Sequence, residues 1–339
     1  MARTVITSNP VAGALNQYLR TAPDDAEGPP TPMPSPSRSY VIGIGSQRAG
    51  TTLLHKILSD CTPVFMHPLK ELHYFDTLFD TREFQLLHGN TRYRHGRRTI
   101  GRRAKASAAR RMAARTGLLL TGRITKRRRA IAQERTLYHS LTVLAQVESV
   151  DELKSVPYAD LYRPAIDDHA IVGEISPEYM LLPDEGVTFM RDQCGPQTTI
   201  ILLRRDPIDR ILSSYVLLKA YRSTEPLGPL DVTEDEMWRE LDNDGRWLQL
   251  QYALSDYEDA ERRFSRRFPD VVTIDLESLI RGDSTVSRYL SDRIDAPVDA
   301  ARYREIVATK ANSFGDFAFS DELVRALRQG FDRAMSQRR

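Results

Sequence analysis

One stretch, YVIGIGSQRAGTTLLHKIL at residues 40–58, constrains the fold more than any other part of the sequence. An apolar run rich in β-branched residues ends in a turn bracketed by Gly45 and Gly50, and an amphipathic pattern follows. This order predicts a buried strand, a tight turn and a helix with its apolar face on Leu54, Ile57 and Leu58. In an open α/β sheet such a turn lies at the carboxyl edge, where ligands bind.

The turn has the spacing of the phosphate loop of nucleotide triphosphatases, with one exception. Thr51 stands where that motif has lysine, and the basic residue, Arg48, lies inside the loop. We expect the backbone N–H groups of residues 46–52 and the start of the following helix to point at one anion. A glycine turn that only allows tight packing is the simpler alternative.

The rest of the chain predicts the fold class. Strands are expected in VFMHP, AIVGEISP, TTIILLRRDP and DVVTIDLESL, and a helix from Pro207 to about Tyr221. Near-continuous apolar strands that alternate with helices are typical of a parallel sheet covered on both faces. We therefore predict an α/β fold, a P-loop-like three-layer sandwich with a central parallel sheet flanked by helices.

Composition shifts indicate the domain organisation. Six prolines fall between Thr21 and Ser37, so residues 1–38 are expected to be a flexible tail and proline-rich linker before a single domain at 39–339. A basic helical insertion is expected at about 86–135. Between Arg92 and Arg129 there are 15 Lys and Arg and no acid, which leaves 33 basic and 46 acidic residues, a net charge of −13, elsewhere.

The basic segment and the cysteines bear on partners and location. Residues 92–129 could form a solvated surface, a contact in a homo-oligomer, or a patch for an anionic membrane surface or polyanion, and we expect no nucleic acid there. Two cysteines, Cys61 and Cys194, favour a reducing compartment. No apolar stretch reaches the ~20 residues of a membrane span. We expect a cytoplasmic protein, either free or peripheral to the inner membrane face.

A second anion site is predicted in ILLRRDPIDRILSSYVLL at residues 201–218. Asp206 can cap a helix and Pro207 suits its first turn. Ser213 lies two turns further on, off the apolar stripe, so its hydroxyl could share a ligand with Arg205 at the strand end. The commoner alternative is an arginine that pairs with a nearby aspartate.

Four stretches together resemble the sulfotransferases that use 3′-phosphoadenosine 5′-phosphosulfate (PAPS). GSQRAGTT resembles the loop that holds the 5′-phosphosulfate, and LRRDPIDRILSSY resembles the run that holds the 3′-phosphate. KELHYFD at 70–76 and GEISPEYM at 173–180 resemble motifs of the branch that sulfates carbohydrates, including heparan sulfate. Ile175 departs from that branch, which often has lysine there, so a cationic role at this position must be absent or supplied elsewhere.

The resemblance implies roles for single residues. The cofactor-binding residues would be Ser46, Gln47, Arg48, Ala49, Gly50, Thr51, Thr52, Arg205 and Ser213. Arg48 would also be catalytic, because it can stabilise the charge that the departing 5′-phosphate gains, with no metal required. The product would be 3′-phosphoadenosine 5′-phosphate (PAP).

The acceptor hydroxyl needs a base. By resemblance this is Glu71, with a pKa raised by burial. His73 is the second candidate and His67 a weaker third. Three functions compete: an O-sulfotransferase acting on a carbohydrate, glycolipid, similar metabolite or non-carbohydrate natural product; a P-loop kinase of a small metabolite, which would require lysine at position 51; and a non-catalytic nucleotide-binding scaffold.

Overall fold

The computed structural model describes residues 39–79, 125–147, 149–163, 165–222, 232–282, 284–309 and 317–338. Its centre is a five-stranded parallel sheet in the order β2-β3-β1-β4-β5. The strands are β1 (Ser39–Gly45), β2 (Phe65–Met66), β3 (Ile171–Ile175), β4 (Thr199–Arg204) and β5 (Asp270–Asp275). All five arise within the stretches that the sequence predicts, although β2 is shorter than VFMHP.

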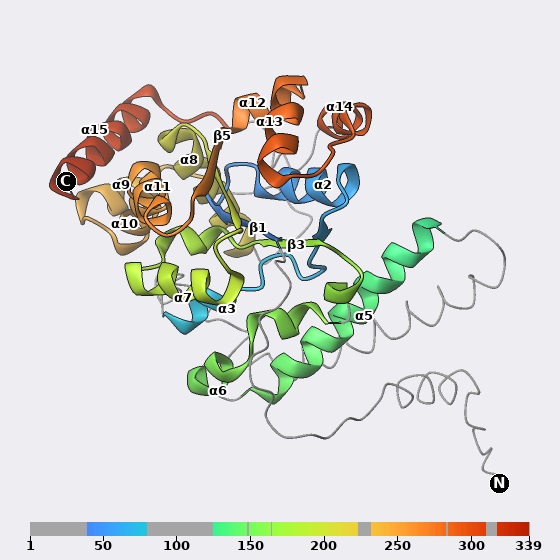
Figure 1. The fold of residues 1–339 in the computed structure, drawn as a ribbon. Helices are drawn as coiled ribbons and strands as arrows, with labels where there is room; N and C mark the ends of the chain where they lie inside the picture. The colour runs from blue at the N-terminus through green and yellow to red at the C-terminus, as the bar shows by residue number, and fades with distance from the viewer. Residues whose placement is uncertain are drawn as a thin grey trace, which may run out of the picture.

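Helices of two kinds connect the strands (Figure 1). The α-helices are α2 (Thr51–Cys61), α3 (Tyr74–Leu78), α5 (Thr125–Gln146), α6 (Val150–Ser155), α7 (Asp184–Cys194), α8 (Pro207–Arg222), α9 (Asp235–Asp242), α10 (Arg246–Ala253), α11 (Tyr257–Ser265), α12 (Leu276–Arg281), α13 (Ser284–Ile294), α14 (Ala300–Ala308) and α15 (Asp321–Arg338). The 3-10 helices are η2 (Tyr158–Tyr162), η3 (Ala165–Asp167) and η4 (Pro177–Leu181).

One face of the sheet is covered by α2, α12, α13 and α14, which lie together above it in Figure 1. Successive side chains of a strand point to opposite faces. Val41 of β1 and Ile201 of β4 therefore lie on this side, against Leu54 and Ile57 of α2. These are the helix residues whose spacing predicts the apolar face.

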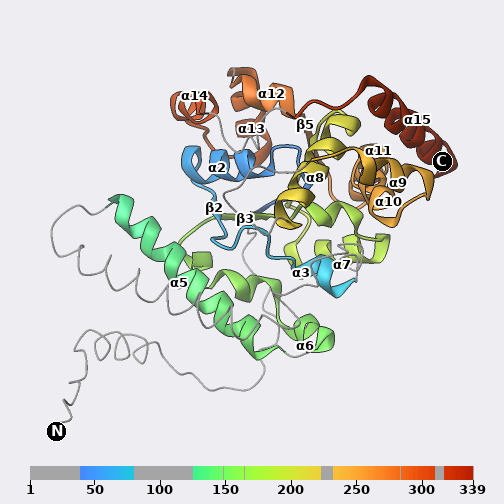
Figure 2. The same ribbon diagram turned by 180° about the vertical axis from the view of Figure 1, so that it is seen from behind.

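The opposite face packs against α3, α7, α11 and the segment from α5 to η3. Here Ile42 and Ile200, which alternate with the residues of the first face, contact a core that includes Phe75, Val187 and Phe264. The rear view in Figure 2 shows the same sheet between the two groups of helices. The three-layer α/β sandwich with a parallel sheet is thus confirmed.

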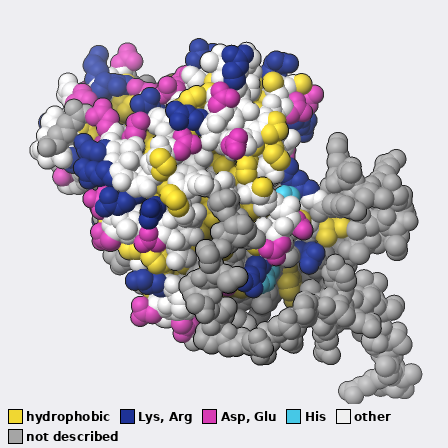
Figure 3. All heavy atoms as spheres, viewed as in Figure 1, with side chains coloured by type: hydrophobic (Ala, Val, Ile, Leu, Met, Phe, Trp, Pro, Cys, Tyr) yellow, Lys and Arg dark blue, Asp and Glu magenta, His cyan; other side chains and the backbone are white. Residues whose placement is uncertain are grey.

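A third cluster joins α8, α9, α10 and α15 beside the sheet. Ile208, Ile211 and Tyr215 of α8 are buried there with Leu323 and Leu327 of α15. The apolar stripe predicted for residues 207–221 is therefore correct. On the surface above these layers, basic and acidic side chains are interspersed (Figure 3).

Part of the predicted insertion lies outside the described residues. Residues 86–124 of the predicted insertion lie outside, and α5 begins at Thr125 within the remainder. The tail and linker at 1–38 also lie outside, so the domain boundaries stay predictions. No helix within the described ranges has both the length and the apolar character needed to cross a membrane.

Candidate active site

The loop after β1 is held in a shape that glycine allows. Gly50 has φ 93° and a Cβ there would lie 2.6 Å from Leu276 Cδ1, so a side chain would be both strained and crowded. Two loop N–H groups are used inside the protein. Ser46 N–H donates to the carbonyl of Leu203, and Ala49 N–H donates to that of Ser46. The expectation that all N–H groups of residues 46–52 point at an anion is therefore wrong for these two.

Ser46 anchors the loop from its side chain as well. The side chain is fully buried and its hydroxyl donates to the carbonyl of Leu254 at 2.6 Å. Gln47 donates through Nε2 to Glu178 Oε1 at 3.3 Å. Thr51 is buried at the start of α2, and Thr52 beside it is exposed. These contacts fix the loop on the carboxyl edge of the sheet.

The two predicted anion motifs meet at Arg48. Its Nε donates to Ser213 Oγ at 3.0 Å, and its own carbonyl accepts from Arg205 Nη1 at 3.2 Å. Arg48 has φ 67°, in the left-handed region that non-glycine residues rarely adopt. Two arginines and a hydroxyl thus converge between β1 and β4. Such a set suits a ligand that carries more than one anionic oxygen.

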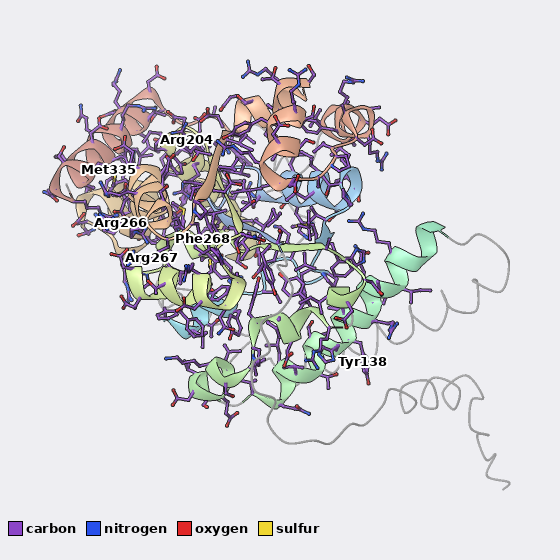
Figure 4. All side chains as sticks on the ribbon, in the orientation of Figure 1. Tyr138, Arg204, Arg266, Arg267, Phe268 and Met335 are labelled. Carbon is purple, nitrogen blue, oxygen red and sulfur yellow. The ribbon has the colours of Figure 1, made fainter. Side chains whose placement is uncertain are left out.

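Asp206 caps α8 as predicted. Its Oδ1 accepts from the N–H groups of Ile208 at 2.9 Å and Asp209 at 3.0 Å. Its Oδ2 accepts from Arg328 of α15. The neighbouring Arg204 instead points to β5, where it pairs with Asp275 at 3.2 Å (Figure 4). Arg205 therefore differs from Arg204, because only Arg205 turns toward the loop.

Arg210 supports the loop from below. Its side chain is fully buried and donates to the carbonyl of Gln47 at 3.3 Å, the carbonyl of Gln251 at 2.7 Å and Ser255 Oγ at 2.8 Å. Burial lowers the pKa of Arg210 to about 10. This leaves Arg210 charged at neutral pH, with its charge held mainly by neutral oxygens beside the loop.

The KELHYFD stretch approaches the loop from the other side. Lys70 Nζ lies 2.9 Å from Thr52 Oγ1 and 2.8 Å from Glu71 Oε1. Glu71 and His73 have φ values of 66° and 55°. Two left-handed residues of this kind need support from their surroundings. Lys70 therefore links Glu71 to Thr52 at the start of α2, and His73 lies on the far side of Glu71, 3.7 Å from its carboxylate.

Glu174 of β3 gives that support. Its buried carboxyl accepts from the N–H of Leu72 at 3.0 Å and from Ser176 Oγ at 2.8 Å. The hydroxyls of Tyr158 and Tyr179 donate to its other oxygen, each at 2.7 Å. The N–H of His73 donates to Ser176 Oγ at 3.2 Å. Glu174 thus joins β3 to both strained residues through the backbone between them.

His73 lies among carboxylates. Its Nδ1 is 2.7 Å from Asp76 Oδ2 and 3.6 Å from Glu178 Oε2, and its Nε2 is 3.7 Å from Glu71 Oε2. Burial favours the neutral ring, but the carboxylates of Asp76 and Glu178 outweigh it and raise the pKa of His73 to about 10. At neutral pH His73 is therefore an imidazolium and cannot accept a proton.

The pKa of Glu71 moves against expectation. Burial would raise it, but the protonated ring of His73, 3.7 Å away, and the charge of Lys70 outweigh burial and lower the pKa of Glu71 well below its ordinary value. The predicted raised pKa is thus wrong for this arrangement. Glu71 is ionised at neutral pH and can accept a proton, whereas His73 can only donate one.

His67, the third candidate base, lies away from Glu71 and His73 in the hydrophobic core. His67 is fully buried, 2.9 Å from Ser140 Oγ and 3.0 Å from the carbonyl of Leu161, and burial lowers its pKa to about 4. Its ring therefore serves the packing of α5 and η2.

Among the described residues, His73, Asp76 and Glu178 form a group that could hold a metal ion, with ligand atoms within 4.8 Å of one another. The protonated ring of His73 already places a positive charge there.

A comparison with known protein families matches residues 41–300 to the family described as "Sulfotransferase family". The chain belongs to the sulfotransferase family. The match includes the loop, the KELHYFD and GEISPEYM stretches and the whole of α8. No curated protein matches the sequence.

Two solved sulfotransferase structures are similar to the chain. One is a sulfotransferase from Alicyclobacillus acidocaldarius, with 15% identity, coverage of 89% of this chain and 94% of that one, and a TM-score of 0.46. The other is the sulfotransferase domain of the Synechococcus PCC 7002 olefin synthase, with 14% identity, coverage of 88% and 93%, and a TM-score of 0.40.

Several residues of the candidate site have no signal in the sequence. Arg210 and Glu178 lie inside the recognised motifs, but no local signal shows that they are buried beside the loop. Tyr158 lies outside every motif and reaches Glu174 only through the fold. Long-range contacts of this kind have no sequence pattern that could have found them.

Proposed function

We propose that this sulfotransferase moves a sulfuryl group from PAPS to a hydroxyl of a carbohydrate, glycolipid or similar metabolite. The observation that supports this most is the contact between Arg48 and Ser213, because it brings together the two motifs that resemble the 5′-phosphosulfate and 3′-phosphate sites. The donor set of Arg48, Arg205 and Ser213 fits a ligand with two separate anionic groups. A non-carbohydrate natural product is the alternative acceptor.

The residues of the chain would divide the work between binding and proton transfer. PAPS supplies the sulfuryl group and a phosphate leaving group. Arg205 and Ser213 would hold the 3′-phosphate, and the loop with Thr51 and Thr52 would hold the 5′-phosphate. Arg48 would turn its charge toward the bridging oxygen, which gains negative charge as its bond to sulfur breaks.

Glu71 would take the proton of the acceptor hydroxyl. The acceptor oxygen forms a bond to sulfur, the bond between sulfur and the bridging oxygen breaks, and the acceptor proton passes to Glu71. The charge of Lys70 lowers the pKa of Glu71, and a bound anion at the loop would offset that charge. The pKa of the carboxyl therefore rises when an anion binds there, which makes Glu71 a better base. His73, Asp76 and Glu178 would keep the carboxylate oriented.

Four further proposals concern the metal requirement, the location and the partners of the protein. The reaction would need no metal, and the protein would be cytoplasmic. It would form a homo-oligomer or contact an anionic surface through residues 92–129. Membership of the sulfotransferase family argues against the kinase alternative, which also requires a lysine at position 51.

Thermal unfolding with added ligands tests the proposal, because a ligand that binds the folded state raises its stability. PAP at saturating concentration should raise the unfolding temperature clearly, whereas ATP with magnesium should raise it little or not at all. A larger shift with ATP and magnesium would contradict the proposal.

A further inference from the structure

Lys70 occupies a position between the two halves of the site. Its ammonium group contacts Thr52, in the first turn of α2, and Glu71, in the segment after β2. The side chains of Lys70 and Glu71 are 32% and 30% exposed, so the pair lies at the accessible rim of the loop. One lysine therefore links the phosphate loop to the proposed base.

The other cations near the loop lie elsewhere. Arg48 contacts Ser213, Arg205 contacts the backbone of Arg48, and Arg210 is buried beneath the loop. Position 175 carries no charge, and Ile175 is buried in the layer under α2, where its side chain fills the space above Gly43. Among the residues that the structure describes, Lys70 is thus the lysine that lies between the loop and Glu71.

We propose that Lys70 is a catalytic residue that binds the sulfuryl oxygens and supplies the lysine charge that position 51 lacks. This inference rests on the proposed function. The transferred group must lie between the loop, which holds the leaving phosphate, and Glu71, which faces the attacking hydroxyl. A cation that touches both Thr52 and Glu71 is next to that group.

The contact with Thr52 adds a second effect. A hydroxyl has one donor and two acceptor positions. Because Thr52 Oγ1 accepts from Lys70, its own proton stays available for an oxygen of the phosphate. A lysine ammonium group has three N–H donors, and a sulfuryl oxygen bound beside Thr52 and Glu71 would accept from one of them. The transfer itself is unchanged: Lys70 stabilises charge and gains or loses no proton.

The simpler alternative is a surface ion pair that only neutralises Glu71. The two alternatives predict different effects of Lys70 on the affinities for PAPS and PAP. A neutralising pair affects ligands with and without the sulfuryl group alike. A sulfuryl-binding lysine affects PAPS much more than PAP, since PAP has lost that group.

Isothermal titration of PAP and PAPS against Lys70→Met, with Lys56→Met as the matched control, tests the proposal. Lys56 is likewise paired with a carboxylate, that of Asp60, at 2.9 Å on α2. Lys70→Met should weaken PAPS binding about tenfold and PAP binding less than about twofold, in line with the loss of one charge-assisted contact. Lys56→Met should change neither.

Equal losses for both ligands, or no loss for PAPS, would overturn the role of Lys70. Failure of the unmodified protein to bind either ligand would overturn the proposed function instead. Thermal unfolding of the two variants separates these results from misfolding, because each removes one exposed pair and should leave the unfolding temperature nearly unchanged.

Discussion

Arg48 Nε donates a hydrogen bond of 3.0 Å to Ser213 Oγ, which joins residues 165 positions apart in the sequence. The contact places the loop after β1 against the middle of α8. On the other side of the loop, Lys70 reaches Thr52 and Glu71. The candidate site therefore has the two predicted anion-binding segments on one side of the loop and, on the other, the segment that carries Glu71, the proposed base.

Glu71→Gln tests the assignment of the base. The amide keeps the size of the side chain but cannot take a proton, so release of PAP from PAPS should slow by about 100-fold or more. PAP affinity should change little, because the loop and Arg205 are untouched. Normal turnover in Glu71→Gln together with an inactive His73→Gln would assign the role to the histidine.

Glu174→Gln should destabilise the fold around the site. The carboxyl accepts four hydrogen bonds, and an amide nitrogen cannot accept the two that Tyr158 and Tyr179 or Leu72 and Ser176 donate. We expect a loss of about 1–3 kcal/mol in the free energy of unfolding. Urea denaturation measures it, and an unchanged midpoint would contradict the supporting role of Glu174.

The buried charge of His73 predicts a pH dependence of stability. Its pKa is raised to about 10, so its contribution is fully present below its ordinary pKa of 6.5 and is lost as the pH rises through about 10. His73→Gln should therefore be less stable than the unmodified protein at pH 6.5, and the difference should narrow toward pH 10. A difference that stays constant or widens over this range would show that His73 is not held protonated.

Arg210→Lys tests how the loop is supported. Lysine keeps the charge but cannot reproduce the planar set of donors to Gln47, Gln251 and Ser255. Buried acceptors left without a donor cost about 1–3 kcal/mol. Arg293→Lys is the control, since Arg293 forms an exposed pair with Asp270 at 2.9 Å. Equal unfolding midpoints for the two variants would argue against this support.

The sequence predicts the local features of this site well and the long-range ones poorly. Strand β1, the turn at Gly50 and the cap at Asp206 follow from residues that are neighbours in the chain. The pKa of Glu71 does not, because its direction depends on Lys70 and on a protonated His73. The raised pKa of His73 depends in turn on Asp76, three residues away in the sequence, and on Glu178, which is 105 positions away and which only the fold brings beside the ring.

The most direct measurement of the central claim is the affinity for PAP relative to 5′-AMP, because the two ligands differ only in the 3′-phosphate. The unmodified protein should prefer PAP. Arg205→Ala should weaken PAP binding by about 1.5–3 kcal/mol and leave 5′-AMP nearly unchanged, since a charge-assisted contact is lost for PAP alone. The adjacent Arg204→Ala, which removes an exposed pair with Asp275, should change neither. Equal affinity of the unmodified protein for both ligands, or equal losses in Arg205→Ala, would contradict the account.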